Sequence, residues 1–106
     1  MILQRSLLTK YLSRQEQLEV KFREYHAKYP GVYDWFVAFA LELIRRGTEQ
    51  YSAYGIIHEI RYRKKFKISN DIIPYYARKF LRDHPQHEGF FILKELTTEN
   101  REPDNE

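Results

Sequence analysis

The segment at residues 69–83 constrains the fold more than any other, because a helix start signal there precedes a two-sided helical pattern. Ser69, Asn70 and Asp71 carry side-chain oxygens that suit a helix N-cap. Pro74 follows at a first-turn position, where a missing backbone N–H removes no hydrogen bond. Apolar residues then recur at helical spacing, at Ile73, Tyr76, Ala77, Phe80 and Leu81. The pattern predicts a short helix with one buried face.

The opposite face of this helix carries one aromatic and three cationic side chains, Tyr75, Arg78, Lys79 and Arg82. A helix with an apolar back and an aromatic, cationic front is suited to lying against phosphates in a nucleic-acid groove. The alternative interpretation is a solvated surface helix with a single exposed tyrosine. The helix alone does not distinguish the two.

The length of 106 residues suits one domain with one modest core. A hydrophobic fraction of 42%, with 16% aromatic residues, indicates a folded globular protein. The absence of cysteine excludes disulfides and thiolate metal sites. The sequence has no apolar run of the roughly 18 residues that span a membrane, and its first residues lack the apolar core of a secretion signal. We therefore expect a soluble, cytoplasmic protein that does not act at a membrane.

The positive charge is concentrated in the middle of the chain. The net charge is +3, but residues 61–82 contain eight lysines and arginines and only one acid, Asp71. The last ten residues carry four acids and one arginine. This distribution indicates a surface that faces a polyanion. It does not choose between nucleic acid and an acidic protein partner.

Residues 1–29 are expected to form an N-terminal helical segment. Ser13 and Glu16 fit a capping box, which predicts a helix start within the segment. Spacings of three and four residues form a seam of about three heptads, at Leu8, Tyr11, Gln15, Leu18, Phe22, Tyr25 and Tyr29. The seam either packs on the chain's own core, giving a monomer, or forms a homodimer interface. In the dimer, Gln15 would help to fix the register.

Residues 30–96 are expected to form the main domain. Pro30 and Gly31 interrupt the chain, and residues 32–46 then predict the most apolar helix, with Gly47 just after its end. Ser52 is a plausible N-cap for a further helix to about residue 63. Residues 64–69 alternate between charged and apolar side chains, which favours a short strand or an extended loop.

The C-terminal part of the chain is expected to contain a turn, a strand and a tail. Pro85 and Gly89 predict a turn at residues 84–89, and the apolar residues 90–96 predict a strand. Residues 97–106 are polar and acidic, which predicts a disordered tail.

The order helix, helix, connector, helix, strand is that of a winged helix-turn-helix domain, in which the third helix reads DNA. We therefore predict a mainly α fold, a small helical domain of winged helix-turn-helix-like order with minor β structure, preceded by an N-terminal helix. Two features depart from the simplest pattern. The connector before Asn70 is long, and one good strand follows the third helix. We expect residues 90–96 to pair with residues 66–68 or with residues near Tyr51.

Three segments carry a resemblance: VYDWFVAFALELIRRG, YSAYGIIHEIRYR and FKISNDIIPYYARKFLRDHPQHEGFF. They resemble a group of small bacteriophage and prophage proteins over about residues 22–96, and the YYARKFLRDHP and GFF letters are the most distinctive. The resemblance implies a bacteriophage or prophage setting, and hence the cytoplasm of a bacterial host. It implies no particular activity and assigns no functional residue.

No constellation in the sequence favours catalysis or a cofactor. His84 and His87 could meet one ion across their turn, but a stable zinc site normally needs three or four ligands. We expect His84 instead to cap the preceding helix. The acids form no recognised catalytic spacing, and the chain has no glycine-rich phosphate loop, no G-x-S-x-G and no cysteine. We expect a protein that is not an enzyme and that holds no metal or cofactor.

Nucleic-acid binding, with DNA favoured over RNA, is the prediction with positive support. The candidate contact residues are Arg61, Arg63, Lys64, Lys65, Lys67, Asn70, Tyr75, Arg78, Lys79 and Arg82. Arg78, Arg82 and Asn70 are the best candidates to read base edges. The alternative is a protein-interaction module that binds and inhibits or modulates a host protein. The DNA hypothesis requires the cations of the loop and of the helix to form one continuous accessible surface.

Overall fold

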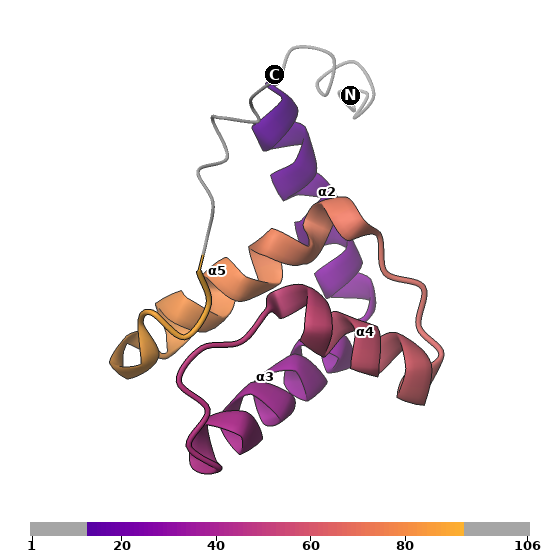
Figure 1. The fold of residues 1–106 in the computed structure, drawn as a ribbon. Coiled ribbons are helices and arrows are strands. Elements are labelled where there is room, and N and C mark those ends of the chain that lie inside the picture. Colours follow the sequence, from indigo (N-terminus) through magenta and orange to yellow (C-terminus); the bar gives the residue numbers. More distant parts are fainter. Residues whose placement is uncertain (1–12, 93–106) are drawn as a thin grey trace, which may run out of the picture.

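The computed structural model describes residues 13–92, which form four α-helices and two short 3₁₀ helices (Figure 1). The elements are α2 (Arg14–Lys28), α3 (Pro30–Arg45), α4 (Ala53–Lys64), η1 (Asn70–Ile72), α5 (Ile73–Asp83) and η2 (Pro85–His87). The prediction of a mainly α fold is confirmed. Residues 13–92 contain no strand, and none of their helices is long and apolar enough to cross a bilayer.

Helix α5 lies among the other three helices and contributes much of the core (Figure 1). Its predicted apolar stripe is confirmed: Ile73, Tyr76, Ala77 and Phe80 are buried, and Leu81 is half-buried. The helix start differs from the prediction, because neither η1 nor α5 has a side-chain cap. The predicted capping oxygens bind elsewhere, since Ser69 donates to Asp71 at 2.6 Å and Asn70 accepts from Arg61 at 2.6 Å.

Helix α3 supplies the opposite wall of the core through Val32, Phe36 and Ala40, each fully buried. It begins two residues earlier than predicted, because Pro30 fits the first turn of a helix instead of breaking it. The predicted end is confirmed. Gly47 follows with a φ of 95°, a left-handed conformation that glycine adopts without steric cost.

Helix α4 and the loop after it follow the prediction closely. The Ser52 hydroxyl accepts a hydrogen bond from the Gly55 N–H at 3.3 Å, which confirms the N-cap. Ile56, Ile57 and Ile60 are buried, and the helix ends at Lys65 in a left-handed conformation, with φ of 61°. Residues 65–69 form a loop and not a strand.

The predicted turn after α5 is confirmed, but the strand after it is not found within the described residues. His84 Nδ1 lies 3.1 Å from the Phe80 carbonyl oxygen, as expected for a C-terminal cap. Phe90 and Phe91 are buried as irregular chain. The Phe90 carbonyl accepts one hydrogen bond from Tyr51 N–H at 3.0 Å, which places this segment beside the α3–α4 connector. Residues 93–106, including the predicted acidic tail, lie outside the described part.

Helix α2 packs on the chain's own core, as the first interpretation of its seam predicts. Its capping box is confirmed by bonds between Ser13 and Glu16 of 2.8 and 3.1 Å. Phe22 is only 5% exposed and belongs to the same core as α3, α4 and α5. Leu8 and Tyr11 lie outside the described residues, so a homodimer through the start of this segment stays a prediction.

We expect Phe22→Ala to lower the free energy of unfolding by about 3–5 kcal/mol, because it removes a buried ring and leaves a cavity. Denaturant unfolding followed by circular dichroism measures the change. Leu41→Ala on α3 is the control, since Leu41 is 36% exposed and its loss should cost less than about 1 kcal/mol. Equal losses in the two variants would contradict the placement of α2 in the core.

Candidate nucleic-acid interface

The front of α5 is not the open surface that the sequence predicts. Tyr75, expected to face outward, is only 7% exposed and stacks on Phe22 of α2 with ring centroids 6.0 Å apart. Its hydroxyl donates to the Gln15 carbonyl oxygen at 3.2 Å. The expectation for Tyr75 is therefore wrong, because α2 lies against this side of α5.

Lys79 lies against Tyr33 of α3 and is only partly exposed. Its ammonium lies 5.0 Å from the ring centroid of Tyr33 and 3.5 Å from the Asp83 carboxylate, and its side chain is 27% exposed. Burial, and next the charge of Lys79, lower the pKa of His26 on α2. The charge of Lys79 thus interacts with Tyr33 of α3, Asp83 of α5 and His26 of α2.

The two arginines of α5 differ in exposure. Arg78 is half-buried, and its Nε atom is buried with no hydrogen-bond partner among residues 13–92. Arg82 is exposed. Of the four side chains predicted to form the front of α5, Arg82 is thus the one that is exposed.

Arg61 and Asn70 hold the loop between α4 and α5 in shape. The Arg61 guanidinium donates to the carbonyl oxygen of Ile68 and, at 2.6 Å, to Oδ1 of Asn70. Each is therefore a hydrogen-bond partner of the other, which occupies Oδ1 of Asn70 and one amino group of the Arg61 guanidinium. Both were predicted as nucleic-acid contacts, and the structure gives them a scaffolding position.

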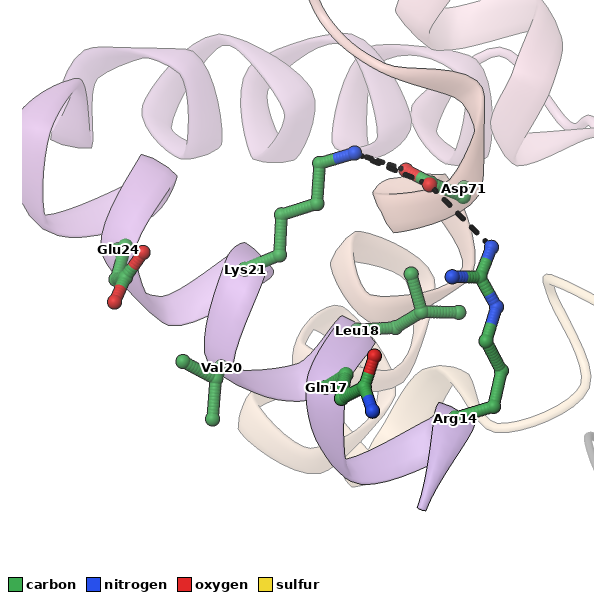
Figure 2. Close-up of a pocket in the computed structure, with 7 residues that line it drawn as sticks. All are labelled: Arg14, Gln17, Leu18, Val20, Lys21, Glu24 and Asp71. Carbon is green, nitrogen blue, oxygen red and sulfur yellow. Dashed lines mark hydrogen bonds and ion pairs between the residues drawn. The ribbon is translucent and has the colours of Figure 1, made fainter. Parts of the chain in front are cut away.

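Asp71, the one acid of the basic segment, is neutralised from α2 (Figure 2). The Lys21 ammonium lies 3.0 Å from its carboxylate and the Arg14 guanidinium 3.9 Å away. The hydrogen bond from Ser69, and then the contact with Lys21, lower the pKa of Asp71. Arg14, Lys21 and Asp71 line a shallow pocket of about 250 Å³ between α2 and η1. The arrangement fastens α2 to the start of α5.

Six of the ten predicted contact residues are exposed, including Asn70 and Arg82. We call the other four the basic ridge: Arg63, Lys64, Lys65 and Lys67. Arg63 pairs with Glu59 at 2.7 Å, but both side chains are largely exposed, so the pair contributes little. The Lys64 ammonium lies 4.6 Å from the Trp35 ring centroid. Lys67 makes no ion pair or side-chain hydrogen bond with the described residues.

The basic ridge and the cations of α5 do not form one continuous surface. The ridge lies at the C-terminal end of α4 and in the loop that leaves it (Figure 1). The C-terminal half of α5, with Arg78, Lys79 and Arg82, extends away toward the opposite side of the molecule (Figure 1). The condition set by the sequence, one surface formed by the cations of both the loop and the helix, is therefore not met.

Sequence reasoning missed the aromatic side chains on the outer face of α4. Tyr54 is 52% exposed and Tyr62 is 75% exposed, and His58 between them is also exposed. Their signal is present in the sequence, because the three positions recur every four residues on the face opposite the isoleucine stripe.

His84 and His87 pack on the core ring of Phe80. The His84 ring stacks on Phe80 at 4.5 Å between centroids, and the His87 ring lies 6.2 Å from it. Within residues 13–92, no group of three or more histidine, aspartate or glutamate side chains could hold a metal ion.

No known family, curated protein or solved structure matches this chain.

The contacts at the end of α5 generate a pH-dependence that can be measured. Tyr33 donates to the Asp83 carboxylate at 2.6 Å, and this bond, then the charge of Lys79, lowers the pKa of Asp83. A carboxyl with a depressed folded-state pKa stabilises the fold above its ordinary pKa, and this stabilisation is lost as the pH falls through the folded pKa. We expect Tyr33→Phe to raise the pKa of Asp83 in an NMR titration of its carboxyl carbon.

Tyr54→Phe is the matched control, because it removes an exposed hydroxyl far from Asp83 in the sequence and on a different helix. The pKa of Asp83 should not change in that variant. An unchanged pKa in Tyr33→Phe would show that the hydrogen bond does not form in solution.

Proposed function

We propose that this protein binds nucleic acid through the basic ridge and that it is not an enzyme. The observation that carries the proposal is the grouping of four exposed cations, Arg63, Lys64, Lys65 and Lys67, with one carboxylate, that of Glu59, paired to them. A cluster of cations on one edge attracts phosphates and releases their counterions on binding. The resemblance to small bacteriophage and prophage proteins suggests, as part of the proposal, that a bacteriophage or prophage encodes the protein.

The fixed conformation of the ridge supports the proposal, because two hydrogen bonds and the packing of one aromatic side chain hold its backbone. Arg61 bonds to the Ile68 carbonyl, and the Tyr25 hydroxyl donates to the Lys67 carbonyl at 2.9 Å. Phe66 packs on Tyr29 and Trp35, each with centroids 5.5 Å apart. A loop fixed before binding loses little conformational entropy when phosphates arrive.

The proposed binding depends on phosphates more than on base sequence. Phosphate contacts position a protein on nucleic acid but carry no sequence information. Asn70 is bound to Arg61, and Arg78 is half-buried, so two of the three candidate base readers are not available. In this proposal the winged helix-turn-helix-like order of α3, α4 and α5 is a scaffold. The proposal keeps DNA over RNA as the ligand. It places the protein in the cytoplasm of a bacterial host cell.

We expect the double variant Lys65→Gln/Lys67→Gln to weaken binding of a labelled 20-mer by about tenfold at low salt. Each lost phosphate contact should also reduce the slope of log affinity against log salt by about 0.7–0.9. Fluorescence anisotropy across a salt series measures both. Arg23→Gln/Arg45→Gln is the matched control, because it removes the same charge from arginines that are 64% and 71% exposed on α2 and α3.

Two results would contradict the proposal. One is an affinity that does not depend on salt, and the other is an equal loss of affinity in the control variant. The second would mean that net charge, and not the ridge, governs binding.

A second candidate function is a module that binds a host protein. A groove of about 350 Å³ between α3 and α4 favours it, since Phe39, Leu43 and Ile56 line it together with charged side chains. Capture from host lysate after nuclease treatment distinguishes the candidates. A partner that binds the intact chain and the ridge variant alike, but not Tyr51→Ala in the groove, would support the protein-binding role.

A further inference from the structure

The outer face of α4 carries a line of aromatic side chains that no core contact explains. Tyr54, His58 and Tyr62 are spaced by four residues, opposite the buried isoleucines. Tyr62 is 75% exposed and Tyr54 is 52% exposed. Neither hydroxyl makes a hydrogen bond within the described part of the chain. We call these three residues the aromatic stripe.

The aromatic stripe leads into the basic ridge. Lys65 lies three residues beyond Tyr62, and its ammonium is 5.6 Å from the centroid of the Tyr62 ring. The stripe positions include no acid. Glu59, at its edge, is already paired with Arg63 at 2.7 Å. A ligand that carries flat rings and negative charges would therefore meet aromatic side chains along the outer face of α4 and cations at its C-terminal end.

The spacing of the rings selects the form of nucleic acid. Tyr54 and Tyr62 are eight residues apart, which is about 12 Å along an α-helix and a rotation of about 80°. Consecutive bases in a duplex strand are separated by about 3.4 Å and are stacked on each other. Rings about 12 Å apart cannot each stack on consecutive bases of a duplex, but they can receive bases that are separated in a single strand.

We infer that the aromatic stripe binds single-stranded nucleic acid, with bases stacked on Tyr54 and Tyr62 and the backbone directed toward the basic ridge. The inference rests on the proposed function and gives it a substrate class. Single-strand binding proteins combine a cationic path for the backbone with aromatic rings for the bases, and the stacking tolerates any base sequence. A duplex, whose bases are already stacked, would contact the ridge alone.

The test compares a labelled 20-nucleotide oligothymidylate with a 20-base-pair duplex, by anisotropy at fixed salt. For the intact chain we expect tighter binding of the single strand. Tyr54→Ala/Tyr62→Ala should weaken single-strand binding by about 30-fold and leave duplex binding within about twofold. Tyr54→Phe/Tyr62→Phe is the matched control. It keeps both rings, so its single-strand affinity should match that of the intact chain.

The outcomes separate this inference from the proposed function. If both forms bind with a salt dependence but the alanine variant binds the single strand unchanged, or loses both forms equally, the inference is overturned and the proposed function stands. If the intact chain binds neither form, both are overturned. Unchanged circular dichroism and thermal midpoint in the alanine variant establish that the fold is retained, as the exposure of the two rings predicts.

Discussion

The packing of α2 over Tyr76 is the contact on which the rest of the structure depends. The Tyr76 side chain is fully buried, with Phe22 of α2 edge-on at 4.7 Å and Phe36 of α3 at 5.7 Å between centroids. Its hydroxyl has no hydrogen-bond partner among residues 13–92, which costs about 1–3 kcal/mol. Burying an aromatic ring stabilises by about 4 kcal/mol or more. The aromatic contacts therefore outweigh the buried hydroxyl and hold α2 against α5.

Contacts within the fold decide which cations are compensated. Lys79 has Asp83 and the ring of Tyr33 beside it, and Lys21 of α2 binds Asp71. Beyond the end of α4, the chain turns through the left-handed Lys65 into a loop that contains no carboxylate until Asp71. The helix with the strongest two-sided pattern is thus a core element, and the basic ridge lies on the last turn of α4 and on the connector before α5.

The sequence predicted the features that depend on a local pattern of residues. It missed the features that depend on how the helices pack on one another. The apolar stripes, the Ser13 and Ser52 caps and the Gly47 end were all visible, because they need only neighbouring residues. Tyr75 was placed wrongly because a helix covered from two sides buries a wider arc than a single stripe shows. The strand predicted at residues 90–96 is not found at residues 90–92, which the structure describes, for a related reason. Phe90 and Phe91 are buried by aromatic contacts with Phe80, and an apolar run does not specify strand pairing.

The basic ridge has a structural explanation that must be weighed against a functional one. Cations at the end of α4 compensate the helix dipole, which is equivalent to about half a negative charge. Glu59 offsets one further cation. Together they account for about one and a half of the four positive charges of the ridge, so between about two and three remain without a compensating group in the fold described here. Helix capping explains the presence of cations after Ile60 but not their number, and the polyanionic ligand that we propose would compensate the excess.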